Sequence, residues 1–326
     1  MALVGLGYYS TDLLAPALQL TKHCKLTGIV TGTPAKIPVW QERYGIKDEN
    51  VYNYDTMPFI ADNPEIDVIY IVLPTGLHSK YAVIAANTGK HVWCEKPMAR
   101  TVVECQDIIQ ACQKNEVKLS IGYRMQHETN TQTVISYATD KPYGRITNVT
   151  AEAGYYDGRS DHWKQQKSMG GGALYDMGVY PINAARYATG EDPIAVSEAR
   201  HETTRPAIYS EVDETTAFTM EFPSGARAKC KTSFGESLNR LWVDCEDGWY
   251  TLAPFQSYNG VRGHTSDGKK LIKPIENQQA KQMDDDALAI INDTDVLVPG
   301  ENGLMDIRIV EAVYESASKG GQRIAL

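Results

Sequence analysis

The sequence predicts an α/β protein of two domains, the first built on a doubly wound parallel sheet and the second, of α+β type, on an open and mainly antiparallel sheet. The length of 326 residues fits two domains at roughly 150 residues each. Short continuous apolar runs alternate with helix-like stretches in the first part, whereas longer strand-like runs and turns dominate after about Gly122. We therefore expect the domains to span residues 1–122 and 123–326.

Short apolar runs mark the strands of the first domain. Each run is continuous rather than alternating, which is typical of strands that helices cover on both faces. Between the runs, Gly89 ends one helical stretch, and Thr101 and Glu104 form a capping box at the start of another. Repeated strand–helix units predict right-handed crossovers and a parallel sheet. The runs are Ala2–Gly5, Leu26–Val30, Val68–Leu73, His91–Cys94 and Leu119–Ile121.

The second domain carries strand signals of another kind. Ile146–Gly154 and Thr215–Phe222 are long strand candidates, and Pro223-Ser-Gly225 predicts a hairpin that returns through Ala226–Ser233. An antiparallel sheet with helices on one face follows from this pattern. Further expected elements are strands at Trp242–Cys245 and Trp249–Leu252 and a last helix over about Leu304–Lys319.

Charge and composition exclude several classes of function. Acidic residues outnumber basic ones 41 to 32, for a net charge of −9, so a nucleic-acid or anionic-membrane surface is not expected as the main partner. No apolar run approaches the roughly 18 residues of a membrane-spanning helix. The six cysteines are scattered without a CxxC pair, which favours buried free thiols and predicts no metal site.

The N-terminus carries no recognisable signal peptide, which favours a cytoplasmic location. The first strand candidate begins almost at Met1, so a preceding segment that was removed stays an alternative. In that case a periplasmic location is possible.

A glycine-rich loop follows the first strand and opens a helix. In Gly5-Leu-Gly7-Tyr-Tyr-Ser10 the first glycine permits a tight turn, and the second lets backbone amides approach a pyrophosphate at the helix N-terminus. Ser10 is bulkier than the usual Gly or Ala, so we expect slightly looser packing of helix on strand. The pattern predicts a Rossmann dinucleotide site with Gly5, Gly7, Tyr8 and Tyr9 as cofactor contacts, and a plain tight turn is the alternative.

The end of the second strand indicates which dinucleotide binds. An NAD site usually has Asp or Glu there for the ribose hydroxyls, but this chain has Thr31-Gly-Thr33-Pro-Ala-Lys36. Two hydroxyls and an ammonium suit a 2′-phosphate, so NADP is favoured over NAD. An exposed lysine at the start of a helix is the alternative for Lys36.

Two further motifs carry candidate chemistry. Glu95-Lys96-Pro97 follows a strand at the edge where doubly wound sheets bind ligands. Downstream of the glycine run 170–172, Asp176, Tyr180 and Asn183 are spaced four and three residues apart, which places them on one face of a helix. The glycine run is expected to be a flexible loop.

At these residues the chain resembles the Gfo/Idh/MocA oxidoreductase family over nearly its whole length. Most relatives have His where Tyr180 stands. With Tyr at this position, the chain resembles glucose–fructose oxidoreductase and related aldose oxidoreductases. The motifs that carry the resemblance are the glycine loop, Pro74-Thr-Gly-Leu-His78, Glu95-Lys-Pro97, Gly122-Tyr-Arg124 and Asp176-Met-Gly-Val-Tyr180.

The resemblance implies a sugar bound between Lys96 and the Asp176/Tyr180 helix, over the nicotinamide. It implies a cis Lys96–Pro97 bond and an open sheet that makes a homodimer or homotetramer. The resulting hypothesis is hydride transfer between an aldose C1 and NADP. Tyr180 would be the acid/base, favoured as tyrosinate by the Lys96 cation, while Asp176 would orient the sugar and hold Lys96.

Other residues are expected to line the two sites, although structural roles stay open for most of them. Arg124 has a domain–domain ion pair as its alternative, and Asp284-Asp-Asp286 is interpreted as a solvated helix face. Expected substrate contacts, besides Lys96, Asp176 and Tyr180, are Tyr123, Trp163 and Asn183; expected cofactor contacts are Pro74, His78, Glu95, Lys96 and Arg124.

Several functions remain compatible with the same motifs. A cyclitol or other sugar dehydrogenase uses the same fold, and a redox-assisted glycosidase uses the same cofactor site. A sensor of sugar or NADP would keep the fold without catalysis. The presence of Lys96, Asp176 and Tyr180 argues against a sensor.

Overall fold

The computed structural model describes all 326 residues, and they form two compact units. The Rossmann unit comprises Met1–His127 and Asn277–Leu304, and the C-terminal unit comprises Glu128–Glu276 and Met305–Leu326. The expected division at residue 122 differs from this in one respect. Residues 277–304 return to the first unit instead of staying with the second.

A six-stranded parallel sheet forms the Rossmann unit, in the order β3-β2-β1-β4-β5-β6. This confirms the doubly wound fold predicted from the apolar runs. The chain moves from the central strand β1 to one side and then crosses to β4 on the other, and such a reversal is where these sheets bind ligands. The strands are β1 (Ala2–Val4), β2 (Gly28–Val30), β3 (Val51–Tyr52), β4 (Val68–Ile71), β5 (His91–Cys94) and β6 (Leu119–Ile121).

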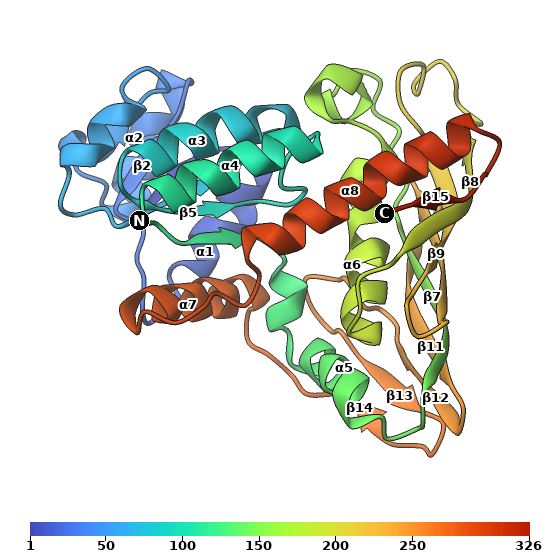
Figure 1. Cartoon of the computed structure of the whole chain (residues 1–326). Coiled ribbons are helices and arrows are strands. Elements are labelled where there is room, and N and C mark those ends of the chain that lie inside the picture. Colours follow the sequence, from blue (N-terminus) through green and yellow to red (C-terminus); the bar gives the residue numbers. More distant parts are fainter. The chain divides into compact units, whose positions relative to one another are not determined.

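Helices cover both faces of this sheet (Figure 1). On one face lie α3 (His78–Asn87) and α4 (Val102–Lys114); on the other lie α1 (Ala15–Ala17) and α7 (Gln278–Ile291). Helix α2 (Ile37–Tyr44) contributes the buried Trp40 to the core of α1 and α7. Because both faces are covered, all residues of these strands are buried except Val51 and His91, which are half-buried, as the continuous runs predicted.

Helix signals in the sequence are largely confirmed. Gly89 follows α3 with φ of +73°, which only glycine adopts readily. At the start of α4 the Thr101 hydroxyl accepts from the Glu104 amide at 3.1 Å. The Glu104 carboxylate, however, accepts from the backbone amide of Arg100 at 2.9 Å rather than from Thr101, so the capping box is displaced by one residue.

The C-terminal unit is built on a nine-stranded sheet in the order β14-β13-β12-β11-β7-β10-β9-β8-β15. Only β7 and β10 pair in parallel, so the sheet is mainly antiparallel as expected. Both predicted hairpins form, β9 with β10 and β11 with β12. The strands are β7 (Ile146–Gly154), β8 (Ala195–Glu202), β9 (Thr215–Glu221), β10 (Arg227–Ser233), β11 (Leu238–Cys245), β12 (Gly248–Leu252), β13 (Gly263–Thr265), β14 (Lys270–Leu271) and β15 (Ile324–Ala325).

Helices lie on one face of this sheet (Figure 1). They are α5 (Thr129–Asp140), α6 (Val179–Thr189) and α8 (Gly300–Ser318), whose first residues belong to the Rossmann unit. Along β7, Val149 and Ala151 are buried toward the helices, whereas Asn148 is exposed on the other side. The period of two therefore matches a sheet with one covered face.

The free thiols favoured by the scattered cysteines are present. All six cysteines are free thiols, and Cys94, Cys105, Cys112 and Cys230 are buried. No helix combines the length and the apolar character that a bilayer-spanning segment requires.

Candidate functional site

The glycine loop after β1 is closed by contacts that require Gly5. This residue has φ of +90°, and a Cβ on it would lie 2.4 Å from the Val72 carbonyl oxygen, at the end of β4. Its amide donates to Val30 of β2 at 3.0 Å. Gly5 therefore brings the loop against both neighbouring strands, at the point where the sheet order reverses.

Gly7 and Ser10 have different roles in the same loop. A Cβ on Gly7 would meet no atom of the chain within 4 Å, so the loop has open space on that side, as a bound pyrophosphate requires. Ser10 is fully buried and donates to the Gly5 carbonyl at 2.5 Å. The hydroxyl thus fills the space beside the loop with a hydrogen bond, and the looser packing expected at Ser10 stays a prediction. Tyr8 is exposed at the loop rim.

The segment after β2 places a cation beside the loop. Lys36 Nζ donates to the Leu6 carbonyl oxygen at 2.6 Å, and an ammonium has two further N–H groups for another acceptor. Thr31 is buried, and its hydroxyl accepts from the Thr33 amide at 3.1 Å. The loop, Thr33 and Lys36 thus fit a phosphorylated ribose, and no carboxylate stands at this strand end.

A buried carboxyl supports the Lys96 turn after β5. Glu95 accepts from the Tyr70 hydroxyl at 2.6 Å, and Gln282 of α7 in turn donates to that hydroxyl at 3.2 Å. Burial raises the pKa of Glu95 and also that of Tyr70. A Cβ on Gly122 would lie 2.7 Å from the Glu95 carboxyl, so that glycine leaves room for it. The contacts assign Glu95 a supporting role.

The predicted cis Lys96–Pro97 bond is present. His78, which is 1 % exposed, bridges this turn to the end of β4. Its two ring nitrogens lie 2.8 Å from the Pro97 carbonyl and 2.7 Å from the Leu73 carbonyl. Burial lowers the pKa of His78. His78 therefore ties the turns that begin at Pro74 and Glu95 together, which is the structural alternative left open for it.

Tyr123 and Arg124 are both buried at the end of β6. The Arg124 guanidinium donates to the Gln278 side chain of α7 at 2.6 Å. This contact lies within the Rossmann unit, so it is not the domain–domain ion pair considered as the alternative. The cofactor and substrate contacts expected of these two residues stay predictions.

The interpretation of Asp284-Asp-Asp286 as a solvated helix face is wrong. Asp284 accepts from the backbone amides of Lys22 and His23, at 2.9 and 2.8 Å. Asp285 pairs with His127 Nδ1 at 2.8 Å. Asp286 is fully buried, and its oxygens lack a well-formed hydrogen bond, although Ser120 and Gln282 lie beside it. The run holds α7 on the unit instead of facing solvent.

In the C-terminal unit the glycine run 170–172 packs tightly and is not a flexible loop. A Cβ on Gly171 would lie 2.4 Å from the Lys164 carbonyl oxygen, and the Gly172 amide donates to that oxygen at 2.8 Å. Asp213 accepts from the Leu174 amide at 2.8 Å and so caps the wide turn Leu174–Gly178 that precedes α6. The glycines therefore let the preceding loop close onto the start of this helix.

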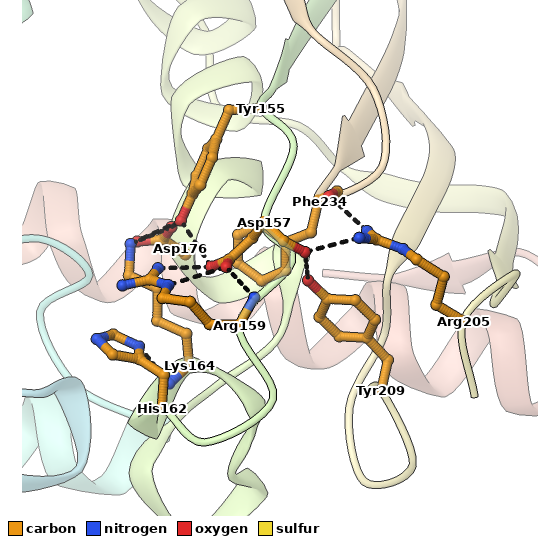
Figure 2. A network of polar contacts seen from close by, with 9 residues as sticks. All are labelled: Tyr155, Asp157, Arg159, His162, Lys164, Asp176, Arg205, Tyr209 and Phe234. Atoms are coloured by element: carbon orange, nitrogen blue, oxygen red, sulfur yellow. Dashed lines mark hydrogen bonds and ion pairs between the residues drawn. The ribbon is translucent and has the colours of Figure 1, made fainter. Parts of the chain in front are cut away.

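Asp176 lies on that wide turn and Tyr180 on the first turn of α6, and both are buried. Figure 2 shows the Asp176 carboxylate meeting Lys164 and Tyr155 from the preceding loop. Lys164 Nζ lies 2.7 Å from Asp176 Oδ2, and the Tyr155 hydroxyl lies 3.2 Å from the same oxygen. Burial, followed by the Asp176 and Asp157 charges, raises the pKa of Tyr155.

A second carboxylate extends this network. Burial alone would raise the pKa of Asp157, but hydrogen bonds from the Arg159 side chain and backbone outweigh it and lower the pKa to about 2. The Asp157 carbonyl accepts from Tyr209 and from Arg205, each at 2.7 Å (Figure 2). Arg205 also pairs with the buried Glu214 at 2.8 Å. Pairs of oppositely charged side chains thus stabilise the loop.

The remaining expected site residues lie in different surroundings. Asn183 is buried and donates to Asp306 of α8 at 3.0 Å, which favours a structural role. Trp163 is partly exposed, and the Lys164 ammonium lies 5.8 Å from its ring centre. Lys96 belongs to the Rossmann unit, whereas Asp176 and Tyr180 belong to the C-terminal unit. Their meeting over a sugar stays a prediction.

Sequence reasoning missed Lys164, Asp157 and Asp213. The available signal was the density of charged and aromatic residues between Tyr155 and Lys164, directly before the glycine run. Nothing in that stretch distinguishes Lys164 from its neighbours until the glycines are seen to pack on its carbonyl. Asp213 is isolated in the sequence and carries no local signal.

Comparisons with known proteins match both units. Residues 1–123 match the family "Oxidoreductase family, NAD-binding Rossmann fold" of GFO/IDH/MocA proteins, and residues 131–251 match the "GFO/IDH/MocA C-terminal domain". Together these models cover most of the chain.

Three relatives show the range of similarity. The crystal structure of an aldose-aldose oxidoreductase from Caulobacter crescentus, complexed with glycerol, is 37% identical and has a TM-score of 0.96, covering 100% of this chain and 98% of that one. A D-xylose 1-dehydrogenase [NADP(+)] of Haloarcula marismortui is 27% identical over 97% of this chain and 90% of its own length. A scyllo-inositol dehydrogenase from Lactobacillus casei, with NAD(H) and scyllo-inositol bound, shares the fold at 19% identity and a TM-score of 0.81, covering 99% and 98%.

Proposed function

The chain belongs to the Gfo/Idh/MocA oxidoreductase family, whose members named above act on sugars and cyclitols, and from this premise we propose that it is an NADP-dependent aldose oxidoreductase. The observation that carries the proposal is the environment of Asp176. This buried carboxylate lies beside Lys164, and Asp176 precedes Tyr180 by four residues. A carboxylate and a phenol on successive turns suit a polyhydroxylated substrate that loses one proton.

The preference for NADP rests on the segment after β2. Lys36 Nζ contacts the Leu6 carbonyl at the rim of the loop. The same segment contains Thr33 and has no Asp or Glu at the end of the strand. A cation there favours a ribose 2′-phosphate, whereas the usual Asp or Glu of an NAD site is missing. The named xylose dehydrogenase uses NADP(+), which agrees with this preference.

The proposed reaction is oxidation of the aldose at C1 to a lactone, and its reverse. When bound, the nicotinamide of NADP accepts the hydride from C1 or returns it. Tyr180 takes the proton of the C1 hydroxyl, so that one hydride and one proton leave the sugar together. In this proposal Lys96 would lie next to this hydroxyl, and Asp176 would accept hydrogen bonds from neighbouring sugar hydroxyls.

A substrate panel tests the proposal. Purified protein is assayed at 340 nm with aldoses and polyols, including inositols, against NADP and NAD. We expect aldoses with NADP to give the highest kcat/KM, and Tyr180→Phe to lower kcat at least 100-fold while NADPH binding changes little. Preference for an inositol would support the cyclitol alternative, tighter binding of NADH would refute the cofactor assignment, and unchanged turnover of the Phe variant would exclude the role of Tyr180.

We also propose that the helix-free face of the nine-stranded sheet joins copies of the chain into a homodimer or homotetramer. Trp242 and Trp249 stack there with ring centres 4.3 Å apart, and Trp242 stands opposite Thr150 on β7. Both side chains are half-buried, and aromatic residues are enriched at such interfaces. Sedimentation of wild type and Trp242→Glu should give an oligomer and smaller species, respectively, and a monomeric wild type would contradict the proposal.

A further inference from the structure

Lys164 braces the Asp176 carboxylate from one side. Its ammonium lies 2.7 Å from Asp176 Oδ2 and 3.0 Å from the Tyr155 hydroxyl, which itself lies 3.2 Å from Oδ2 (Figure 2). The Lys164 ammonium, the Tyr155 hydroxyl and Asp176 Oδ2 therefore lie within hydrogen-bond distance of one another. Lys164 and Tyr155 thus fix the position of this carboxylate oxygen.

The backbone of Lys164 is fixed before its side chain reaches Asp176. The Gly172 amide binds its carbonyl at 2.8 Å, and the His162 side chain accepts from its amide at 3.3 Å. The ammonium also lies 5.3 Å from the centre of the Tyr155 ring, within range of a cation–π contact. Only 20% of the side chain is exposed, so this ammonium is held in place rather than free to move in solvent.

Lys164 is a charged partner of Asp176 within this unit, and several neighbouring groups are paired with one another or carry little charge. Asp157 and Arg159 satisfy each other through two side-chain hydrogen bonds, the longer of 2.9 Å. Burial, and then the charges of Arg159 and Lys164, lowers the pKa of His162, which therefore adds little positive charge at neutral pH. Tyr155 contributes a neutral hydroxyl.

Resting on the function proposed above, we propose that Lys164 is a positioning residue for the reaction. Its ammonium holds the Asp176 carboxylate in position for the sugar hydroxyls and favours its ionised form, and Tyr155 is the second brace. A cation at this distance favours the charged form of a carboxylate, so removing it weakens that preference. Asp176 would then bind protons more readily and sugar hydroxyls less well.

The first test compares three lysine variants. Lys164→Met should lower kcat/KM for the best substrate roughly 10–100-fold and move the acidic limb of its pH profile about 1–3 units upward. Lys164→Arg should restore most of both. Lys167→Met removes the same charge three residues later, at an exposed position, and should change neither. NADPH binding and thermal unfolding are measured for each, because a merely structural role would lower stability without moving the pH profile.

A double-mutant cycle shows whether Lys164 acts through Asp176. In an Asp176→Asn background the amide cannot ionise, so Lys164→Met should then cost less than about twofold. An equal loss in both backgrounds would overturn the proposal, as would a pH profile that stays in place.

A readout without turnover keeps this inference separate from the proposed function. In carboxyl-¹³C spectra, the resonance that disappears in Asp176→Asn identifies Asp176. Its titration midpoint should rise in Lys164→Met and return in Lys164→Arg. If the wild type oxidises no aldose but this midpoint moves, the proposed function fails and the role of Lys164 stands; if the midpoint does not move, the role of Lys164 fails whatever the substrate.

Discussion

Two pairs of buried carboxyl groups, one pair in each unit, have pKa values shifted in opposite directions. In the Rossmann unit Glu95 has neutral partners and Asp286 lacks a well-formed hydrogen bond, and burial raises the pKa of both, that of Asp286 to about 6. In the C-terminal unit the side chains of Asp157 and Glu214 are also largely removed from solvent, but arginines bind them and lower their pKa values. Burial and hydrogen bonds from cations therefore act together on the ionisation of these carboxyl groups.

This contrast predicts opposite responses of stability to pH. A raised folded pKa adds stability below the unfolded value, and this is lost as pH rises through the folded pKa. A lowered folded pKa adds stability above the unfolded value of about 4, and this is lost as pH falls. Through these carboxyl groups, the Rossmann unit loses stability as pH rises and the C-terminal unit loses stability as pH falls.

Arg205→Met should have the largest effect, because it makes Glu214 resemble the Rossmann carboxyls. The side chain of Glu214 is 3% exposed, and Arg205 also binds the carbonyls of Asp157 and Phe234. We expect a loss of about 3 kcal/mol in urea unfolding, at the low end for a broken buried pair because Arg205 is 20% exposed. The control is Arg227→Met, which breaks an exposed pair with Glu198 and should change stability by less than about 0.5 kcal/mol.

Asp286→Asn should stabilise the Rossmann unit at alkaline pH. The pKa rises from 3.8 to about 6 on folding, a difference of about 2 units, so the ionised group costs about 3 kcal/mol at pH 8 and almost nothing at pH 4. Ser120, Gln282, His127 and Asp285 surround or neighbour this group. Hydrogen exchange of α7 at the two pH values measures the difference, and equal gains at both would contradict the assignment.

Tyr70→Phe should destabilise the same unit more at pH 8 than at pH 5. The Glu95 carboxylate loses its 2.6 Å donor, and a hydrogen bond to a charged group contributes about 1.5–3 kcal/mol. Once protonated, Glu95 no longer depends on this donor as a charged group. Tyr44→Phe is the control, because the buried Tyr44 hydroxyl has no hydrogen-bond partner and its removal should cost nothing.

Arg159→Met should have the smallest effect, about 1 kcal/mol at pH 7, because Arg159 is 49% exposed and solvent screens the pair. The loss should shrink as pH falls toward 2, where Asp157 itself becomes protonated. Calorimetry at pH 7 and pH 3 measures this. A loss that grows in acid would show that Asp157 is not held ionised by Arg159.

Periodicity in the sequence predicts the sheets well, since strand burial and hairpin turns leave local signals. The continuous runs give five of the six parallel strands, and the 223–225 turn gives the hairpin of β9 and β10. The strand β3 was missed because it has only two residues, and β13 to β15 because such short strands at or near the ends of the sheet depend on their neighbours more than on their own sequence. The eight-residue strand β8 was also missed.

The candidate site was predictable only where chemistry coincides with a motif. Gly5, Lys96 and Asp176 stand in such motifs. Lys164 does not, because its role depends on a loop that closes across twelve residues onto Asp176. Asp286 was misjudged for a related reason: three consecutive acids suggest a solvent-facing helix, and only tertiary packing shows that one of them is enclosed.

Helix α7 returns from late in the chain to complete the Rossmann unit. Met283 and Ala287 pack into the same core as Leu14 and Trp93. A fragment that ends at residue 122 would therefore expose this core and lose the hydrogen bond from Gln282 to Tyr70. The Rossmann unit therefore cannot be transferred to another protein as one continuous segment. During translation it can be completed only after the intervening unit, Glu128–Glu276, has been synthesised.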